Sequence, residues 1–172
     1  MMKLGLGLSL AALLAIGCGD DDAEDGGGAD AGAADAAATP TTFEVTLTAD
    51  DEVPFCTSAG PDATGEGTVT ISADNSEVAV ELEWSGLSGD ATAAHIHFGA
   101  DGAMGGVIFP LGMPPTNPVT ATFTADDYPD KIPTGAPADF AGFVTVMLAG
   151  TSYLNVHTTL CAPGEIRGQI DD

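Results

Sequence analysis

The chain has 172 residues and a formal net charge of −23, because 26 aspartates and glutamates face only three lysines and arginines. Such an acidic surface repels nucleic acid and anionic membrane surfaces, so no nucleic-acid partner is expected and any membrane partner would be reached through a lipid anchor. The length leaves one domain of about 130 residues after an N-terminal leader and a linker, and a domain of that size buries a core unaided.

The first residues have the pattern of an export signal. Lys3 precedes an apolar run over 4–16, which is too short to span a membrane but suits a signal-peptide core. The run ends in Ala15-Ile16-Gly17-Cys18, which resembles the lipobox of bacterial lipoproteins, although leucine is more usual at the first position. The resemblance implies a signal peptide over 1–17, cleavage before Cys18 and acylation of that cysteine. An ordinary signal peptide cut near Gly17 is the alternative.

Residues 18–42 consist mainly of aspartate, alanine and glycine, with no aromatic or large aliphatic side chain. Nothing in this stretch offsets the entropy of ordering the chain, so we predict a disordered acidic tether. It would hold a domain over 43–172 away from a membrane in the cell envelope, on its periplasmic or outer-membrane side.

From Phe43 onward, apolar residues recur at every second position, which is the period of half-buried strands. The clearest alternation runs from Val78 to Trp84, and turn-forming Gly, Pro, Asp and Asn clusters separate the segments. We find no sustained helical period after the leader. The pattern predicts an all-β fold, an antiparallel Greek-key sandwich or barrel of immunoglobulin-like or superoxide-dismutase-like type. Strands are expected near 43–47, 67–71, 78–84, 94–98, 107–111, 119–124, 140–148, 153–158 and 165–170.

All three histidines lie in two of these predicted strands. His95 and His97 alternate with apolar residues, and His157 follows Val156, so the imidazoles point away from the core side. If the two strands are neighbours, the three rings converge on one patch that can bind a metal. The alternative is a polar ladder in which the rings only hydrogen-bond to neighbouring residues.

The other two cysteines, Cys56 and Cys161, remain as a pair once Cys18 carries lipid. In an exported, oxidising setting this pair is expected to form a disulfide. Metal ligation is the less favoured alternative, because the two cysteines are far apart and neither has a Cys-x-x-Cys spacing.

Arg167 is the only arginine, and it lies in the last predicted strand on the same face as Glu165. Two arrangements are open: an exposed guanidinium beside the histidines that attracts a small anion, or a salt bridge to Glu165 or another carboxylate. Together with Asn155, these residues are expected to surround the metal ligands or to bind an anion.

Several motifs along 43–170 resemble the CHRD domain, which is named after chordin and is common in bacterial exported proteins. The resemblance implies a β-rich extracellular module and says little about activity. The motifs are Phe43-Glu44-Val45-Thr46-Leu47, Glu52-Val53-Pro54, Gly65-Glu66-Gly67, Ser85-Gly86-Leu87, Ala94-His95-Ile96-His97-Phe98-Gly99, Tyr153-Leu154-Asn155-Val156-His157-Thr158 and Gly164-Glu165-Ile166-Arg167-Gly168-Gln169.

The two histidine motifs also resemble the copper-ligand pattern of copper/zinc superoxide dismutases. The resemblance implies that His95, His97 and His157 are copper ligands, and imidazole suits both oxidation states of copper. No further histidine exists to bridge a second metal, so a fourth ligand would be water or a carboxylate.

These patterns leave three functions open. The first is a lipid-anchored module that binds copper or a similar ion, for sequestration or handling. The second is a non-catalytic cell-surface interaction module without metal, and the third is a copper-dependent dismutase-like enzyme. No catalytic nucleophile with a recognisable histidine and carboxylate set occurs, so no catalytic residue is predicted. We expect a monomer or weak oligomer, and the sequence names no protein partner.

Overall fold

Eight antiparallel strands form the framework of residues 38–172, the part of the chain that the computed structural model describes. The predicted signal peptide, the predicted lipidation site Cys18 and most of the predicted tether lie outside the described residues. The strands are β1 (Thr41–Thr48), β2 (Thr64–Ile71), β3 (Glu77–Ser85), β4 (Ala91–Phe98), β5 (Gly106–Gly112), β6 (Val119–Thr124), β7 (Ser152–Thr158) and β8 (Ile166–Gln169). A short 3-10 helix, η1 (Ala125–Asp127), and one α-helix, α1 (Phe140–Leu148), complete the elements.

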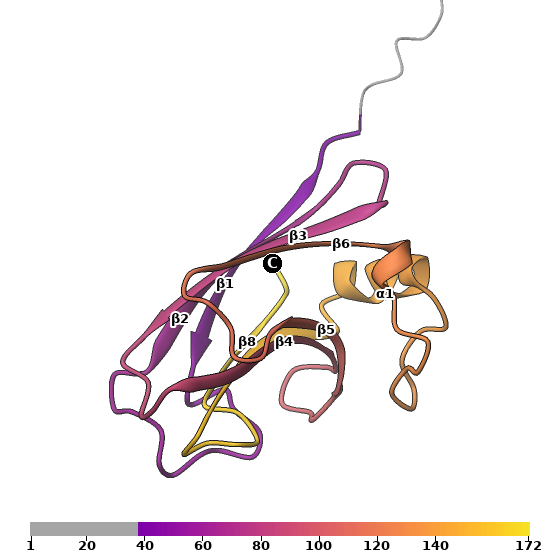
Figure 1. Ribbon diagram of the computed structural model, residues 1–172. Helices are drawn as coiled ribbons and strands as arrows, with labels where there is room; N and C mark the ends of the chain where they lie inside the picture. Colours follow the sequence, from indigo (N-terminus) through magenta and orange to yellow (C-terminus); the bar gives the residue numbers. More distant parts are fainter. Residues whose placement is uncertain (1–37) are drawn as a thin grey trace, which may run out of the picture. The chain divides into compact units, whose positions relative to one another are not determined.

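The strands form one sheet in the order β5-β4-β7-β8-β1-β2-β3-β6. Strand β6 returns to pair with β3, and β7 returns to pair with β4, which are Greek-key connections. The sheet curves until β6 lies over β5, so its two edge strands approach each other (Figure 1). The predicted all-β Greek-key barrel is therefore confirmed.

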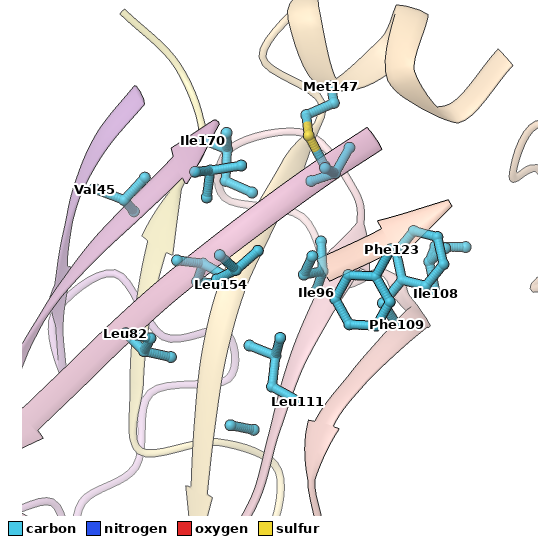
Figure 2. Packing of buried hydrophobic residues seen from close by; sticks show 14 of the residues in the cluster. Val45, Leu82, Ile96, Ile108, Phe109, Leu111, Phe123, Met147, Leu154 and Ile170 are labelled. Carbon is cyan, nitrogen blue, oxygen red and sulfur yellow. The ribbon is translucent and has the colours of Figure 1, made fainter. Parts of the chain in front are cut away.

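The core fills the space inside this curved sheet. On β1, every second residue is buried from Phe43 to Leu47, as expected for a strand with one face against the core. Strands from opposite sides meet there: Leu82 of β3 and Leu154 of β7 both point into the interior (Figure 2). Gly67 leaves room for this packing, because a Cβ at that position would collide with the side chain of Leu154.

The predicted strand over 140–148 is wrong, because this segment is helix α1. The buried residues are Phe140, Phe143, Val144 and Met147, a spacing that places all four on one helical face. The helix begins at Asp139, whose side chain accepts a hydrogen bond from the backbone N–H of Gly142. The helix therefore covers one end of the barrel with apolar side chains, and Met147 is a core residue as its apolar context suggests.

No helix within residues 38–172 has both the length and the apolar character required to cross a membrane.

Candidate metal centre

The strand register brings the three histidines together. Strands β4 and β7 pair antiparallel, with His95 opposite Asn155, His97 opposite Tyr153 and Ala93 opposite His157. Because side chains alternate between the two faces, His95, His97 and His157 all project from the face away from the core. The two strands are neighbours although 62 residues separate His95 from His157.

One ring nitrogen from each histidine lies within 4.8 Å of one from each of the others. The closest pair is Nδ1 of His95 and Nε2 of His157, 3.1 Å apart. Two nitrogens bound at about 2.0–2.1 Å to one tetrahedral ion are about 3.3 Å apart, so this spacing fits shared ligation with little movement. The three side chains can hold one metal ion.

Two backbone carbonyls orient the imidazoles. Nδ1 of His97 donates to the carbonyl oxygen of Gly105, and Nδ1 of His157 donates to that of Ala162, each over 3.0 Å. A carbonyl oxygen only accepts, so the proton lies on Nδ1 and leaves a lone pair on Nε2 of both neutral rings. Such outer hydrogen bonds orient the ligand histidines of metal proteins.

The Nε2 atom of His97 is available to bind a metal. It is buried and has no hydrogen-bond partner among the described residues. Buried polar atoms are rarely left without a partner, and one ligand atom from each of the three histidines lies within 4.8 Å of the others. The three imidazoles and this unpaired atom therefore suit a metal ion.

The histidines are more enclosed than alternation alone suggests, with His95 only 9% and His97 only 7% exposed. Burial lowers the pKa of both rings to about 4; the nearby histidines add to the effect for His95, and the hydrogen bond to Gly105 opposes it for His97. Burial also lowers the pKa of His157. All three rings are therefore neutral at pH 7, so a metal need not displace a proton from a charged ring.

The loop over 99–105 contacts the site through Gly105 and is fastened to β8. Arg167 donates to the carbonyl oxygens of Ala103 and Ala100, over 2.7 Å and 2.9 Å. Gln169 donates to the carbonyl of Gly99. Gly105 is required where the loop turns back on β4, because a Cβ there would collide with the carbonyl of Phe98.

Arg167 takes neither of the two arrangements that the sequence left open. Its side chain is 1% exposed, and its guanidinium carbon lies 3.6 Å from the ring centroid of Tyr153. Its hydrogen bonds in the described part of the chain go to the two loop carbonyls and to Gln169, not to a carboxylate. The residue is thus a buried clamp stacked on an aromatic ring.

Glu165 hydrogen-bonds to two other loops and to strand β7. Its carboxylate, 0% exposed, accepts hydrogen bonds from the backbone N–H groups of Gly60 and Ser88 and from the hydroxyls of Ser88 and Thr158. Burial acts to raise the pKa of Glu165, but these hydrogen bonds outweigh it and hold the pKa below its usual value. Its expected salt bridge to Arg167 is replaced by these four bonds.

Glu52 and the role of Asn155 were not identified from the sequence. Asn155 lies between His95 and Arg167 in the register, and its amide donates to the carboxylate of Glu52 and to the carbonyl of Ile166. Glu52 is 4% exposed, and burial raises the pKa of its carboxyl despite the hydrogen bonds from Asn155 and Val53. Glu52 lies in the loop between β1 and β2 and follows no alternating pattern, so periodicity does not mark it as buried.

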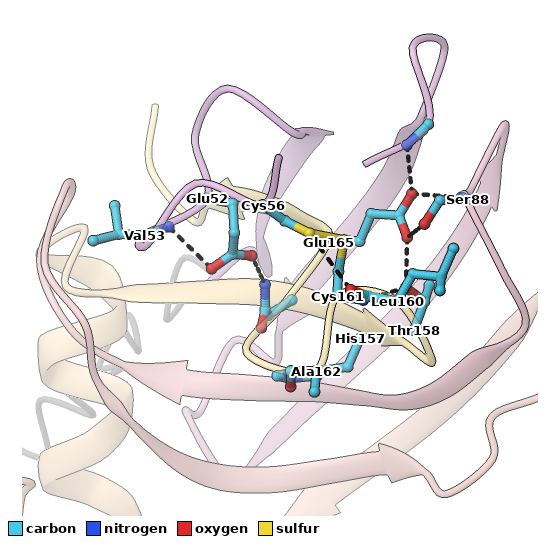
Figure 3. The surroundings of a disulfide bond; sticks show 12 residues. Glu52, Val53, Cys56, Ser88, His157, Thr158, Leu160, Cys161, Ala162 and Glu165 are labelled. Carbon is cyan, nitrogen blue, oxygen red and sulfur yellow. Dashed lines mark hydrogen bonds between the residues drawn. A yellow bond between two sulfur atoms is a disulfide. The ribbon is translucent and has the colours of Figure 1, made fainter. Parts of the chain in front are cut away.

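The predicted disulfide between Cys56 and Cys161 is confirmed. It fastens the loop after β1 to the turn after β7, next to the Ala162 carbonyl that holds His157 (Figure 3). The hydrogen bonds of Glu165 reach the same region from the other side (Figure 3). The turn that orients His157 is therefore held by the disulfide and by the hydrogen bonds of the buried Glu165 carboxylate.

Comparison with known proteins gives one positive result. The family model described as the CHRD domain matches residues 43–170. No curated protein and no solved structure matches the chain.

Proposed function

The chain belongs to the CHRD domain family, and on this premise we propose that it is an exported, lipid-anchored protein whose domain binds one copper ion or a similar metal. His95, His97 and His157 are the ligands, and Cys18 carries the anchor. The convergence of three ring nitrogens within 4.8 Å of one another is the observation that carries the proposal.

Three further features support metal binding. The rings are neutral at pH 7, the Nε2 atom of His97 has no partner, and backbone carbonyls orient His97 and His157. Imidazole nitrogen suits copper, zinc, iron and nickel, so the ligand type alone admits several ions. Copper is the first choice because the histidine pattern resembles that of copper/zinc superoxide dismutases.

We assign the site to sequestration or handling of the ion. The strongly acidic surface attracts cations and repels small anions such as superoxide. A dismutase-like enzyme is the less favoured function. If copper-loaded protein disproportionates superoxide faster than the same amount of free copper, this assignment is wrong.

Metal binding is tested by calorimetric titration of the full chain with Cu(I), in the absence of oxygen, and with Cu(II). We expect one tight equivalent in the wild type and none in the triple variant His95→Ala, His97→Ala, His157→Ala. The control variant Glu44→Gln, Glu66→Gln, Glu81→Gln removes acids that lie on the exposed outer face of β1 to β3. It should retain the tight equivalent, and equal binding by the wild type and the histidine variant would contradict the proposal.

The anchor has a separate test. Replacement of Cys18 by serine should move the protein from the membrane fraction to the soluble fraction of cells that express the full chain. Acylation of Cys18 should appear in the mass of the wild-type N-terminal peptide only. A protein that remains soluble with Cys18 intact would contradict the anchor.

A metal-free interaction or structural module is the second candidate function. One observation favours it: every histidine already has a protein contact, through the His95–His157 hydrogen bond and the stacking of His97 on Tyr153. This function predicts no tight metal binding and lower stability of the triple variant. The same titration therefore distinguishes the two functions.

A further inference from the structure

We propose that the three-histidine site selects Cu(I) over divalent ions, and that the buried positive charge of Arg167 sets this selection. The inference rests on the proposed function, because it concerns which ion the same site takes. It follows from the charges and the number of ligands around the site.

The ligands bring no negative charge to the site. All three are imidazoles, and the groups that orient His97 and His157 are the carbonyls of Gly105 and Ala162. Within residues 38–172, no carboxylate hydrogen-bonds to any of the three rings. A bound ion therefore keeps its full charge in a largely enclosed place, and the cost of burying an ion rises with the square of its charge. This favours a monovalent ion.

The number of ligands points the same way. Among the described residues, the cluster contains three possible ligand groups and no fourth. Zinc takes four protein ligands in structural sites and three protein ligands plus a water in catalytic sites, whereas Cu(I) can be bound by three nitrogens alone. His95 and His97 are both more than nine-tenths buried, which leaves little room for water molecules as extra ligands.

A fixed positive charge lies behind one ligand. The ring of Tyr153 stacks on His97, with 4.7 Å between ring centroids, and the guanidinium of Arg167 lies 3.6 Å from the same Tyr153 ring. His97 is on β4 and Arg167 on β8, the two strands that flank β7, so Tyr153 separates them. The guanidinium cannot move away, because two loop carbonyls and Gln169 hold it.

Two buried acids, Glu52 and Glu165, lie in the described part of the chain near β7 and β8, and neither hydrogen-bonds to a histidine. Glu165 accepts from Gly60, Ser88 and Thr158, and Glu52 accepts from Asn155 and Val53. Burial also raises the pKa of the Glu52 carboxyl, which reduces its tendency to carry charge. Arg167 therefore remains the fixed charge stacked behind a ligand.

The charge of Arg167 lowers the affinities for monovalent and divalent ions in a fixed ratio. A point charge repels a divalent ion twice as strongly as a monovalent ion at the same position, so the logarithms of the affinities change in a ratio of two to one. At a separation on the order of 10 Å and an effective dielectric constant of about 20, the factors are about tenfold for Cu(I) and about a hundredfold for a divalent ion. A variant that merely loosens the site lowers both affinities and has no reason to keep this ratio.

The experiment measures Cu(I) and Zn(II) affinities of the full chain by competition with chromophoric chelators, without oxygen. The wild type should bind Cu(I) more tightly than Zn(II), by at least the factor of about ten by which the charge of Arg167 separates the two ions. Arg167→Gln removes the charge and should raise the affinity for Zn(II) by the square of the factor for Cu(I). Arg167→Lys is the matched control, because it loses the planar fork but keeps the charge, and its Zn(II)-to-Cu(I) ratio should stay near that of the wild type.

Several results would overturn the inference. If the wild type binds Zn(II) as tightly as Cu(I), the site does not select Cu(I). If Arg167→Gln changes both affinities by the same factor, the charge of Arg167 does not set the selection. Circular dichroism reports whether that variant folds. If it does not, Ala162→Lys adds a positive charge at an exposed position beside His157, and it must weaken Zn(II) binding by the square of the factor for Cu(I). A protein that binds neither ion contradicts the proposed function itself, which is a different result.

Discussion

The phenol ring of Tyr153 lies almost parallel to the imidazole of His97, with 4.7 Å between centroids and 11° between planes. The hydroxyl of Tyr153 also accepts a hydrogen bond from the N–H of Gly105, whose carbonyl in turn accepts from His97. The two contacts together fix both the plane and the proton position of this ring. Tyr153 is therefore a positioning residue for one ligand of the candidate metal centre.

We predict that Tyr153→Leu weakens metal binding by up to about tenfold, because stacked aromatic pairs contribute about 0.5–1.5 kcal/mol beyond their area. Tyr153→Phe keeps the ring and loses only the hydroxyl, so it should retain most of the affinity. Chelator competition measures both variants. Equal loss in the two would show that the hydroxyl, rather than the stacked ring, positions His97.

Stability should depend on pH through the buried histidines. The pKa of His95 and of His97 is about 4 in the folded protein against an ordinary value of 6.5, so below pH 6.5 the unfolded chain binds more protons. Their contribution is fully present above pH 6.5 and is lost as the pH falls towards about 4. Urea unfolding of the metal-free protein at pH 7, 6 and 5 should show a falling free energy of unfolding.

The control for this pH dependence is the variant His95→Gln, His97→Gln, whose free energy of unfolding should fall less over the same range. Most carboxylates remain ionised down to pH 5, so the histidines dominate there. Glu52 has a raised pKa and acts with the opposite sign. An unchanged slope in the variant would assign the effect to other groups.

Glu165→Gln should lower the free energy of unfolding by about 3 kcal/mol, because hydrogen bonds to a buried charge are strong and their donors would lose the carboxylate. Four donors from three segments depend on this side chain. Urea denaturation measures the change. The exposed Glu83→Gln on β3 is the matched control and should stay within about 0.5 kcal/mol of wild type. Similar values for the two variants would show that Glu165 is not a stabilising centre.

Loss of the disulfide should cost about 4 kcal/mol, since it joins residues 105 apart and long closed loops restrict the unfolded chain most. Thermal unfolding with and without a thiol reductant should show a clear fall in melting temperature for the wild type. In the double variant Cys56→Ala, Cys161→Ala the melting temperature should be low already and insensitive to the reductant. A wild type that the reductant leaves unchanged would contradict this contribution.

The strand pattern and the shared face of His95 and His97 could be predicted because both depend on local alternation. His95 and His97 flank Ile96, and that spacing alone places the two rings on one face of a strand. The pairing of β4 with β7 then adds His157. The buried clamp of Arg167 could not be predicted, because its acceptors are backbone carbonyls of Ala100 and Ala103, which leave no mark in the sequence.

Helix α1 was predicted as a strand for a different reason. Its buried face, Phe140, Phe143, Val144 and Met147, has helical spacing. The other positions of the helix include the apolar Ala141, Val146 and Leu148, so the whole segment is rich in apolar side chains. A short apolar run does not distinguish a helix from a buried strand by period alone. The signal that could have decided the matter was Asp139, which caps the helix three residues before Gly142.

The sequence separation of 62 between His95 and His157 has a consequence for the order of folding. Strands β5 and β6 and helix α1 all lie in that interval, so β4 and β7 can pair only after a long loop has closed. Contacts of such high sequence separation form late and slow the folding of β-rich domains. An ion that needs all three nitrogens is therefore bound only by chains that have completed the barrel, and metal uptake during refolding should follow the slowest step of folding rather than the initial collapse.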